Sequence, residues 1–173
     1  MCHRLRPLRP PLCVATVGAM PQLNAEQLIE QSTAARDALL EQAGSISESR
    51  IYRNTDRAGW TLKHELSSVT AADAQLIHVA RELARGRSWP SDGLDVRRLF
   101  AEVMHSVQNV RLKVLRERLA ADGERVTLAL TEHREALERP LTLVGHEITS
   151  FSDLAHSHLD RVRGAADAFA KGR

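Results

Sequence analysis

Two polar side chains stand at inward positions of apolar helical patterns, and they are the residues best placed to do chemistry. Asp73 lies three residues before Leu76 in one pattern, and His158 lies four residues before Val162 in another. Steps of three and four residues keep side chains on one helix face, so this carboxylate and this imidazole are expected to point inward. Because a buried polar group without a partner is costly, we expect each to find a hydrogen bond or a water molecule.

The other histidines show no spacing typical of a metal site. His156 and His158 are two residues apart, roughly 200° around a helix, so they cannot chelate one ion from regular helix geometry. Five more are scattered without an HxxxH pair, and we expect them to be surface or capping residues: His64, His78, His105, His133 and His146. The chain also contains no CxxC, no glycine-rich phosphate loop and no GxSxG. Residue patterns alone therefore predict no catalytic group, no metal ligand set and no cofactor.

Apolar residues recur at helical spacing through most of the chain. Asn24 and Gln27 resemble a capping box, Thr61 can cap a second helix, and Gly123 is expected to end a third. The predicted helices cover about residues 25–43, 62–86, 96–122 and 142–169. Residues 124–140 give a mixed pattern, because Val126, Leu128 and Leu130 alternate as in a strand while residues 131–137 look like a short capped helix, and we expect a connector there. These elements predict an all-α four-helix bundle.

The chain has 173 residues, 24 Lys and Arg against 22 Asp and Glu, and 43% hydrophobic residues. A charge of +2 is too small to favour nucleic acid as a partner. No apolar run approaches the roughly 20 residues of a membrane-spanning helix. This composition predicts a single helical domain over residues 22–173 that does not bind membranes.

Residues 1–21 differ from the rest in composition. They contain Arg4, Arg6 and Arg9, and four of the six prolines. We expect a disordered tail or an upstream extension, and less readily a weak signal or transit segment. Both cysteines, Cys2 and Cys13, lie in this stretch, so no disulfide framework is predicted and a reducing cytoplasm is the expected location.

Several segments resemble the DinB/YfiT-like superfamily of four-helix bundles. They are GWTLK at 59–63, the following HELSSVTAADAQLI and ELARG, and later TEHREALERPLTL and SDLAHSHLDRVR. The superfamily includes metal-dependent enzymes that use low-molecular-weight thiols. The resemblance implies three metal-binding histidines, and their positions fall on Ser68, Leu154 and His158, so the histidine triad is largely lost.

Neighbouring residues do not restore this triad. A register two residues earlier gives Ser152 and His156, but the apolar pattern favours His158 as the inward residue. His64 lies on the same face as Ser68 but a full turn away, about 5.4 Å. A lone imidazole does not hold a catalytic metal, which needs about three protein ligands. Asp73 and His158 could instead fill the vacated space, or form a structural pair in the core or at a solvent-open end.

The resemblance implies a metal-free or degenerate DinB-like protein that acts as a binding or stress-response module. A metal-dependent thiol transferase or hydrolase with a rebuilt site is the alternative, and a partner-binding helical domain outside the superfamily is a third. The expected partners are a small-molecule ligand in the bundle end and a second copy of the chain in a homodimer.

Overall fold

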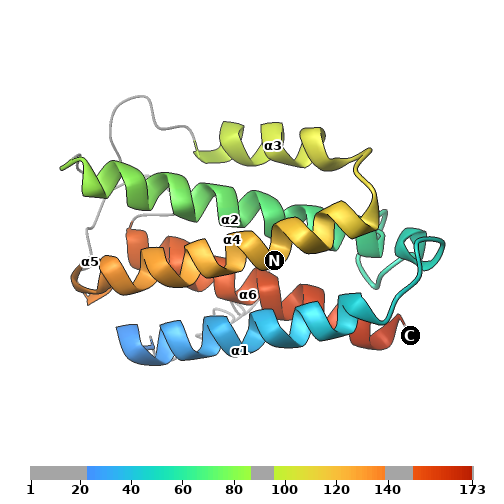
Figure 1. The fold of residues 1–173 in the computed structure, drawn as a ribbon, viewed down its shortest axis with the longest axis horizontal. Coiled ribbons are helices and arrows are strands. Elements are labelled where there is room, and N and C mark those ends of the chain that lie inside the picture. The colour runs from blue at the N-terminus through green and yellow to red at the C-terminus, as the bar shows by residue number, and fades with distance from the viewer. Residues whose placement is uncertain (1–22, 87–95, 139–149, 173) are drawn as a thin grey trace, which may run out of the picture.

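The computed structural model describes residues 23–86, 96–138 and 150–172. Within these ranges the elements are α1 (Ala25–Gly44), the 3-10 turn η1 (Arg50–Tyr52), α2 (Leu62–Ala84), α3 (Val96–Val107), α4 (Leu112–Glu132), α5 (Arg134–Glu138) and α6 (Phe151–Lys171). Figure 1 shows α1, α2, α4 and α6 side by side as a bundle, with α3 along the outer side of α2. The prediction of an all-α bundle is confirmed.

The four bundle helices run in two directions. In Figure 1, α1 and α6 run one way and α2 and α4 run the other way. Both α1 and α2 pack against α4 and α6, so α1 and α2 face each other across the bundle. At the start of α2, Leu62 lies against Gly172 at the end of α6. Neighbouring helices such as α2 and α6 are therefore antiparallel, which fixes which of their residues can meet.

The two predicted helix starts are confirmed by their caps. Asn24 accepts a hydrogen bond from Gln27 N (2.8 Å), and the Gln27 side chain accepts one from Asn24 N (3.2 Å). Thr61 caps α2, and His64 Nδ1 accepts a hydrogen bond from Thr61 N (3.0 Å). His64 is thus a capping histidine, as expected of the scattered histidines.

The predicted third helix is wrong in its extent, because residues 96–122 do not form one helix. α3 ends at Val107, and α4 begins at Leu112. Tertiary contacts start the new helix: the carboxylate of Glu48 accepts a hydrogen bond from Leu112 N (3.0 Å), and Arg116 donates to the carbonyl of Ile46. The break also changes which side faces inward, so Val114, expected inside, is 48% exposed.

The predicted connector at residues 124–140 is wrong in its first part, which belongs to α4, whereas the short helix expected at 131–137 corresponds to α5 (Arg134–Glu138). Gly123 lies inside α4 rather than at its end, and α4 continues to Glu132. Val126 and Leu130 are buried four residues apart, whereas Leu128 is 56% exposed, which is a helical and not a strand pattern.

In the part of the chain that the structure describes, the last helix, α6, begins at Phe151. Ser150 caps α6 by accepting a hydrogen bond from Asp153 N (3.0 Å). The expected start near Thr142, the expected core positions Val144 and Ile148, and the N-terminal tail lie outside the described residues. Among those that the structure describes, no helix has the length and apolarity to cross a membrane.

Candidate functional site

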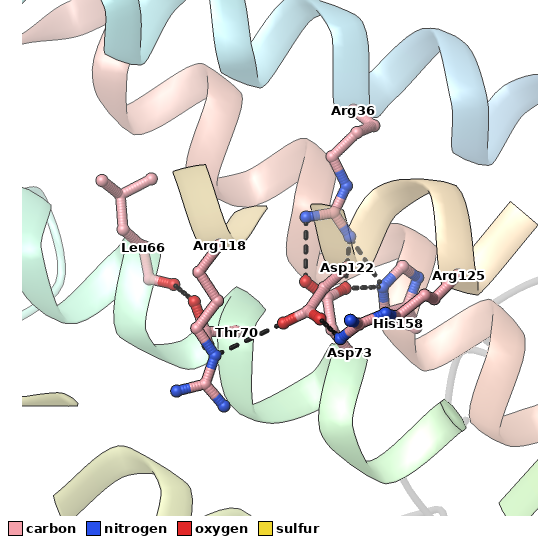
Figure 2. Close-up of polar contacts among 8 residues, drawn as sticks. All are labelled: Arg36, Leu66, Thr70, Asp73, Arg118, Asp122, Arg125 and His158. Atoms are coloured by element: carbon pink, nitrogen blue, oxygen red, sulfur yellow. Dashed lines mark hydrogen bonds and ion pairs between the residues drawn. The ribbon is translucent and has the colours of Figure 1, made fainter. Parts of the chain in front are cut away.

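Asp73 and His158 meet in the interior of the bundle, as their spacing predicts. Asp73 is 0% exposed and His158 2%. His158 Nε2 lies 2.7 Å from Asp73 Oδ1, so α2 and α6 are joined by a buried hydrogen bond (Figure 2). The reading of these residues as solvent-open positions is therefore wrong.

A third residue, Arg36 of α1, completes this group, and we call the three residues the buried trio. Arg36 Nη1 donates to Asp73 Oδ2 (3.0 Å), and Nη2 donates to Asp73 Oδ1. Nη2 also lies 3.2 Å from His158 Nε2. Figure 2 shows the guanidinium directed at both partners from α1. The trio thus ties together three helices of the bundle.

The position of Arg36 could have been predicted from helical spacing, but the apolar pattern was traced through the neighbouring Ala35 instead. Arg36 lies four residues after Ser32 and three before Leu39, which is the same counting that identifies Asp73 and His158. Both Ala35 and Arg36 are buried, so the inward face of α1 is wider than one line of residues.

The fourth bundle helix, α4, contacts the buried trio through a glycine, Gly123, which leaves space for the Arg36 side chain. A Cβ on Gly123 of α4 would lie 3.2 Å from Arg36 Cγ and 3.3 Å from Arg36 Cδ. The arginine side chain therefore passes directly over the glycine on its way to Asp73. No feature of the sequence pattern pointed to this role of Gly123.

The charges within the buried trio explain the ionisation of Asp73. Burial alone would raise the pKa of Asp73, but the charge of Arg36 and the hydrogen bond from His158 outweigh it, so this pKa lies below its ordinary value of 3.8. Asp73 is then an anion with only acceptor atoms, and His158 Nε2 must carry the hydrogen that it shares with Oδ1. His158 Nδ1 is buried and has no hydrogen-bond partner within residues 23–86, 96–138 and 150–172.

The buried trio lies far from the bundle ends. Arg36, Asp73 and Gly123 are near the middle of α1, α2 and α4, and His158 is in the first half of α6. Of the positions considered for Asp73 and His158, the structure therefore shows the one in the core and not the one at an end of the bundle.

The three positions that the resemblance implies for a metal do not meet. Ser68 is five residues before Asp73 on α2, and Leu154 is four residues before His158 on α6. Because the two helices are antiparallel, these steps lead in opposite directions and separate Ser68 and Leu154 by about 13 Å along the bundle, at about 1.5 Å per residue. The Ser68 hydroxyl instead donates to the Glu65 carbonyl (2.8 Å).

The alternative register also fails to bring ligands together. His156 Nδ1 contacts the Ser152 carbonyl of its own helix at 2.8 Å. Within the part of the chain that the structure describes, no three His, Cys, Asp or Glu side chains are grouped so that they could hold a metal ion.

Two further features lie near the buried trio. Asp122, next to Gly123, pairs with Arg118 (3.4 Å) and Arg125 (3.0 Å) along α4 (Figure 2). A shallow hollow of about 450 Å³ lies between α1 and α6 and is lined by Gln31, Ala34, Ala35, Ala38, Arg163, Ala166 and Asp167.

The expected ligand at a bundle end and the expected homodimer stay predictions.

Comparison with known proteins identifies the fold. No family model matches the sequence, and no curated protein is similar to it. The colibactin self-resistance protein ClbS, solved in complex with double-stranded DNA, superposes with a TM-score of 0.67 at 14% identity, over 88% of this chain and 96% of that one.

Two further solved structures are similar at 14% identity. An uncharacterised protein from Clostridium difficile 630 gives a TM-score of 0.66 over 86% of this chain and 94% of its own, and a protein from Streptococcus pneumoniae gives 0.64 over 88% and 93%. At this identity the likeness concerns architecture. The chain therefore has the all-helical fold of ClbS and of these two bacterial proteins.

Proposed function

We propose that this chain is a metal-free member of the DinB/YfiT-like superfamily that acts as a binding module in a stress or resistance response. One observation carries the proposal: the guanidinium of Arg36 contacts both Asp73 and His158. A carboxylate and an imidazole are side chains that commonly ligate metals, and here they hold a permanent organic cation. Arg36 thereby supplies the positive charge that an ion would supply to a metal-binding relative.

The surroundings of the buried trio support a structural role for that charge. Its members are 6% exposed or less, and Asp73 is fully enclosed. The charge of Asp73 balances that of Arg36, and among the described residues His158 Nδ1 is the buried polar atom of the trio that lacks a hydrogen-bond partner. We infer that the trio holds the bundle in shape, and that ligands bind elsewhere on the protein.

The fold supports a binding role through ClbS, a self-resistance protein that was solved with double-stranded DNA. The net charge of +2 argued against nucleic acid here. The ClbS complex shows that a protein of this fold can contact DNA. The fold therefore gives no reason to exclude DNA as a partner. We keep a small-molecule ligand as the first proposal and DNA as a partner to be tested beside it.

The alternative, a metal-dependent thiol transferase or hydrolase with a rebuilt site, is favoured by one observation. His158 Nδ1 and His156 Nε2 are both buried, and neither has a hydrogen-bond partner among the residues that the structure describes. Imidazole nitrogens in this condition are free to ligate. Their two residues are not grouped with a third ligand among the described ones, which is why we place this function second.

Metal analysis separates the two proposals. We expect the purified, dialysed protein to hold well under one zinc or nickel per chain, and added zinc to leave its melting temperature unchanged. Stoichiometric metal that survives dialysis would contradict the first proposal. A zinc-induced rise in melting temperature that disappears in His158→Ala, but persists in the exposed control His105→Ala, would assign the metal to the second.

A further inference from the structure

The outward side of α4 carries a row of apolar residues that the bundle leaves uncovered. Val114 is 48% exposed and Leu128 is 56% exposed, and Ala121, which is also exposed, lies midway between them. Steps of seven residues keep the three side chains within about 40° of one another around the helix axis, along about 21 Å of its length. We call Val114, Ala121 and Leu128 the outer row.

The outer row points away from the helices that α4 packs on. α4 contacts α1 and α2 through its opposite side, where Leu115, Leu119 and Val126 are buried. Within the described part of the chain, Tyr52 is the only other large hydrophobic residue that is exposed, and it lies in η1. An apolar residue at every seventh position keeps one line of a helix turned toward a partner helix. The outer row is therefore suited to contact a helix of another molecule.

Charged residues of opposite sign flank the outer row. Glu117 and Glu124 lie on one side of it, and Arg118 and Arg125 lie on the other. The side chains of Glu117 and Arg125 are 63% and 61% exposed, and that of Arg118 is 41% exposed. Both arginines contact Asp122 of the same helix with one nitrogen each, which holds them beside the outer row and occupies only part of their N–H donors. The surface is thus apolar along its centre, acidic on one side and basic on the other.

This distribution of charge distinguishes the two ways in which a second copy of the chain could place its α4 against the outer row. If a two-fold axis relates two antiparallel helices, like sides face each other, so glutamates would meet glutamates and arginines would meet arginines. If the two helices are parallel, unlike sides face each other. Arg118 would then lie opposite Glu117 of the second copy, and Arg125 would lie opposite Glu124. Because like charges across an interface are costly, the charges favour the parallel pair.

We propose that the outer row is a self-association surface, through which two copies of the chain pair with their α4 helices parallel. Contact between the two rows covers Val114 and Leu128 and forms the apolar centre of the interface, while the glutamates and arginines form ion pairs at its rim. The proposal gives the expected homodimer a location and an orientation. It is independent of the proposed binding function, because the buried trio lies inside the bundle and not at this surface.

Analytical ultracentrifugation of the full chain over a range of concentrations measures the association. We expect the wild type to show a monomer–dimer equilibrium, and Leu128→Glu to weaken it at least about tenfold, because a charge would be buried at the centre of the pair. Val114→Glu repeats the test if Leu128→Glu fails to fold. Tyr52→Ser removes an exposed hydrophobic residue elsewhere and should associate as the wild type does. A wild type that stays monomeric, or an equal loss in the α4 variants and Tyr52→Ser, would overturn the proposal.

Glu124→Arg tests the orientation of the pair. Glu124 is exposed and forms no ion pair with any described residue, so the substitution leaves the contacts within one copy intact. In a parallel pair the new arginine would face Arg125 of the second copy, and we expect association to weaken about fivefold. In an antiparallel pair it would face glutamates and strengthen association. Association that is unchanged or tighter would therefore contradict the parallel arrangement.

Engineered cysteines test the register of the two outer rows directly. In a parallel pair the two Leu128 residues lie opposite each other, so Leu128→Cys should form a disulfide between copies under air oxidation. Glu117→Cys is the control, because each introduced thiol faces the arginine side of the other copy and should stay reduced. Peptide mass spectrometry distinguishes these thiols from the native Cys2 and Cys13. A dimer in which Leu128→Cys forms no disulfide, or in which Glu117→Cys forms one as readily, would reject the proposed pairing.

Discussion

The aliphatic part of Arg36 lies directly over Gly123, so close that a methyl group added to the glycine would be 3.2 Å from Cγ and 3.4 Å from Nε of the arginine. This contact joins α1 to α4 at the level where α1 also reaches α2 and α6. The buried trio thus depends on a residue that has no side chain. A substitution of Gly123 would displace Arg36 and so change the geometry of the ion pair, although it removes no charged group.

Gly123→Ala should therefore gain little or no stability. An alanine in a helix interior is favoured over glycine by about 1 kcal/mol, but here the new methyl group must push Arg36 aside. Gly164→Ala on α6 is the matched control, because a Cβ at Gly164 meets nothing within 4 Å and should give the full gain. Urea unfolding of the two variants measures the difference. Equal gains would show that Arg36 shifts without cost.

Removing the charge of Asp73 should be the most damaging single change in the buried trio. Asp73→Asn leaves the Arg36 guanidinium buried without its counter-charge, at a cost of about 3–5 kcal/mol. His158→Ala leaves the Arg36–Asp73 pair in place and should cost about 1–3 kcal/mol. Denaturant titration gives both values. A larger loss for His158→Ala than for Asp73→Asn would mean that the imidazole, and not the guanidinium, is the main partner of the carboxylate.

A control for the same series replaces all three members with apolar residues. Arg36→Met, Asp73→Leu and His158→Leu together remove every charge of the buried trio at once. Replacement of a whole buried ionic group is often nearly neutral, so we expect this triple variant to be more stable than Asp73→Asn alone. If it is the less stable of the two, packing around the trio matters more than its charges.

The stability that Asp73 contributes should vanish in acid. Its pKa is lower in the folded chain than the ordinary value of 3.8, so the folded state favours the ionised form. The stabilisation by Asp73 is complete at pH values above the ordinary pKa of 3.8. It is lost as the pH falls from this value through the lower pKa of Asp73 in the folded chain. Urea unfolding between neutral pH and strong acid should show the advantage of the wild type over Asp73→Asn shrinking in that window. A difference that is independent of pH would reject the ion pair.

The interior side chains of this bundle were largely open to prediction from the sequence. Asp73 and His158 follow from counting, because each fills a helical step between apolar neighbours, and Arg36 obeys the same rule. The caps at Asn24 and Thr61 are also local features, in which a side chain bonds to a backbone three residues away. Local rules suffice where the partner lies within one helical turn.

Contacts between distant segments were not open to such prediction. α4 begins at Leu112 because Glu48, from the loop after α1, caps it. Gly123 stays helical inside α4, against its usual role at helix ends, where Arg36 passes over it. In both places a contact with a residue far away in the chain overrides local helix propensity. The periodicity of apolar residues along the sequence does not indicate which distant residue makes that contact.

The separations along the chain within the buried trio have a consequence for the order of folding. Arg36 and Asp73 are 37 residues apart, whereas His158 is 85 residues from Asp73 and 122 from Arg36. During synthesis from the N-terminus, the first two residues can pair long before α6 has left the ribosome. The imidazole arrives last and closes contacts of high sequence separation, which are the slow ones to form. α6 therefore completes the interior that α1, α2 and α4 have already formed.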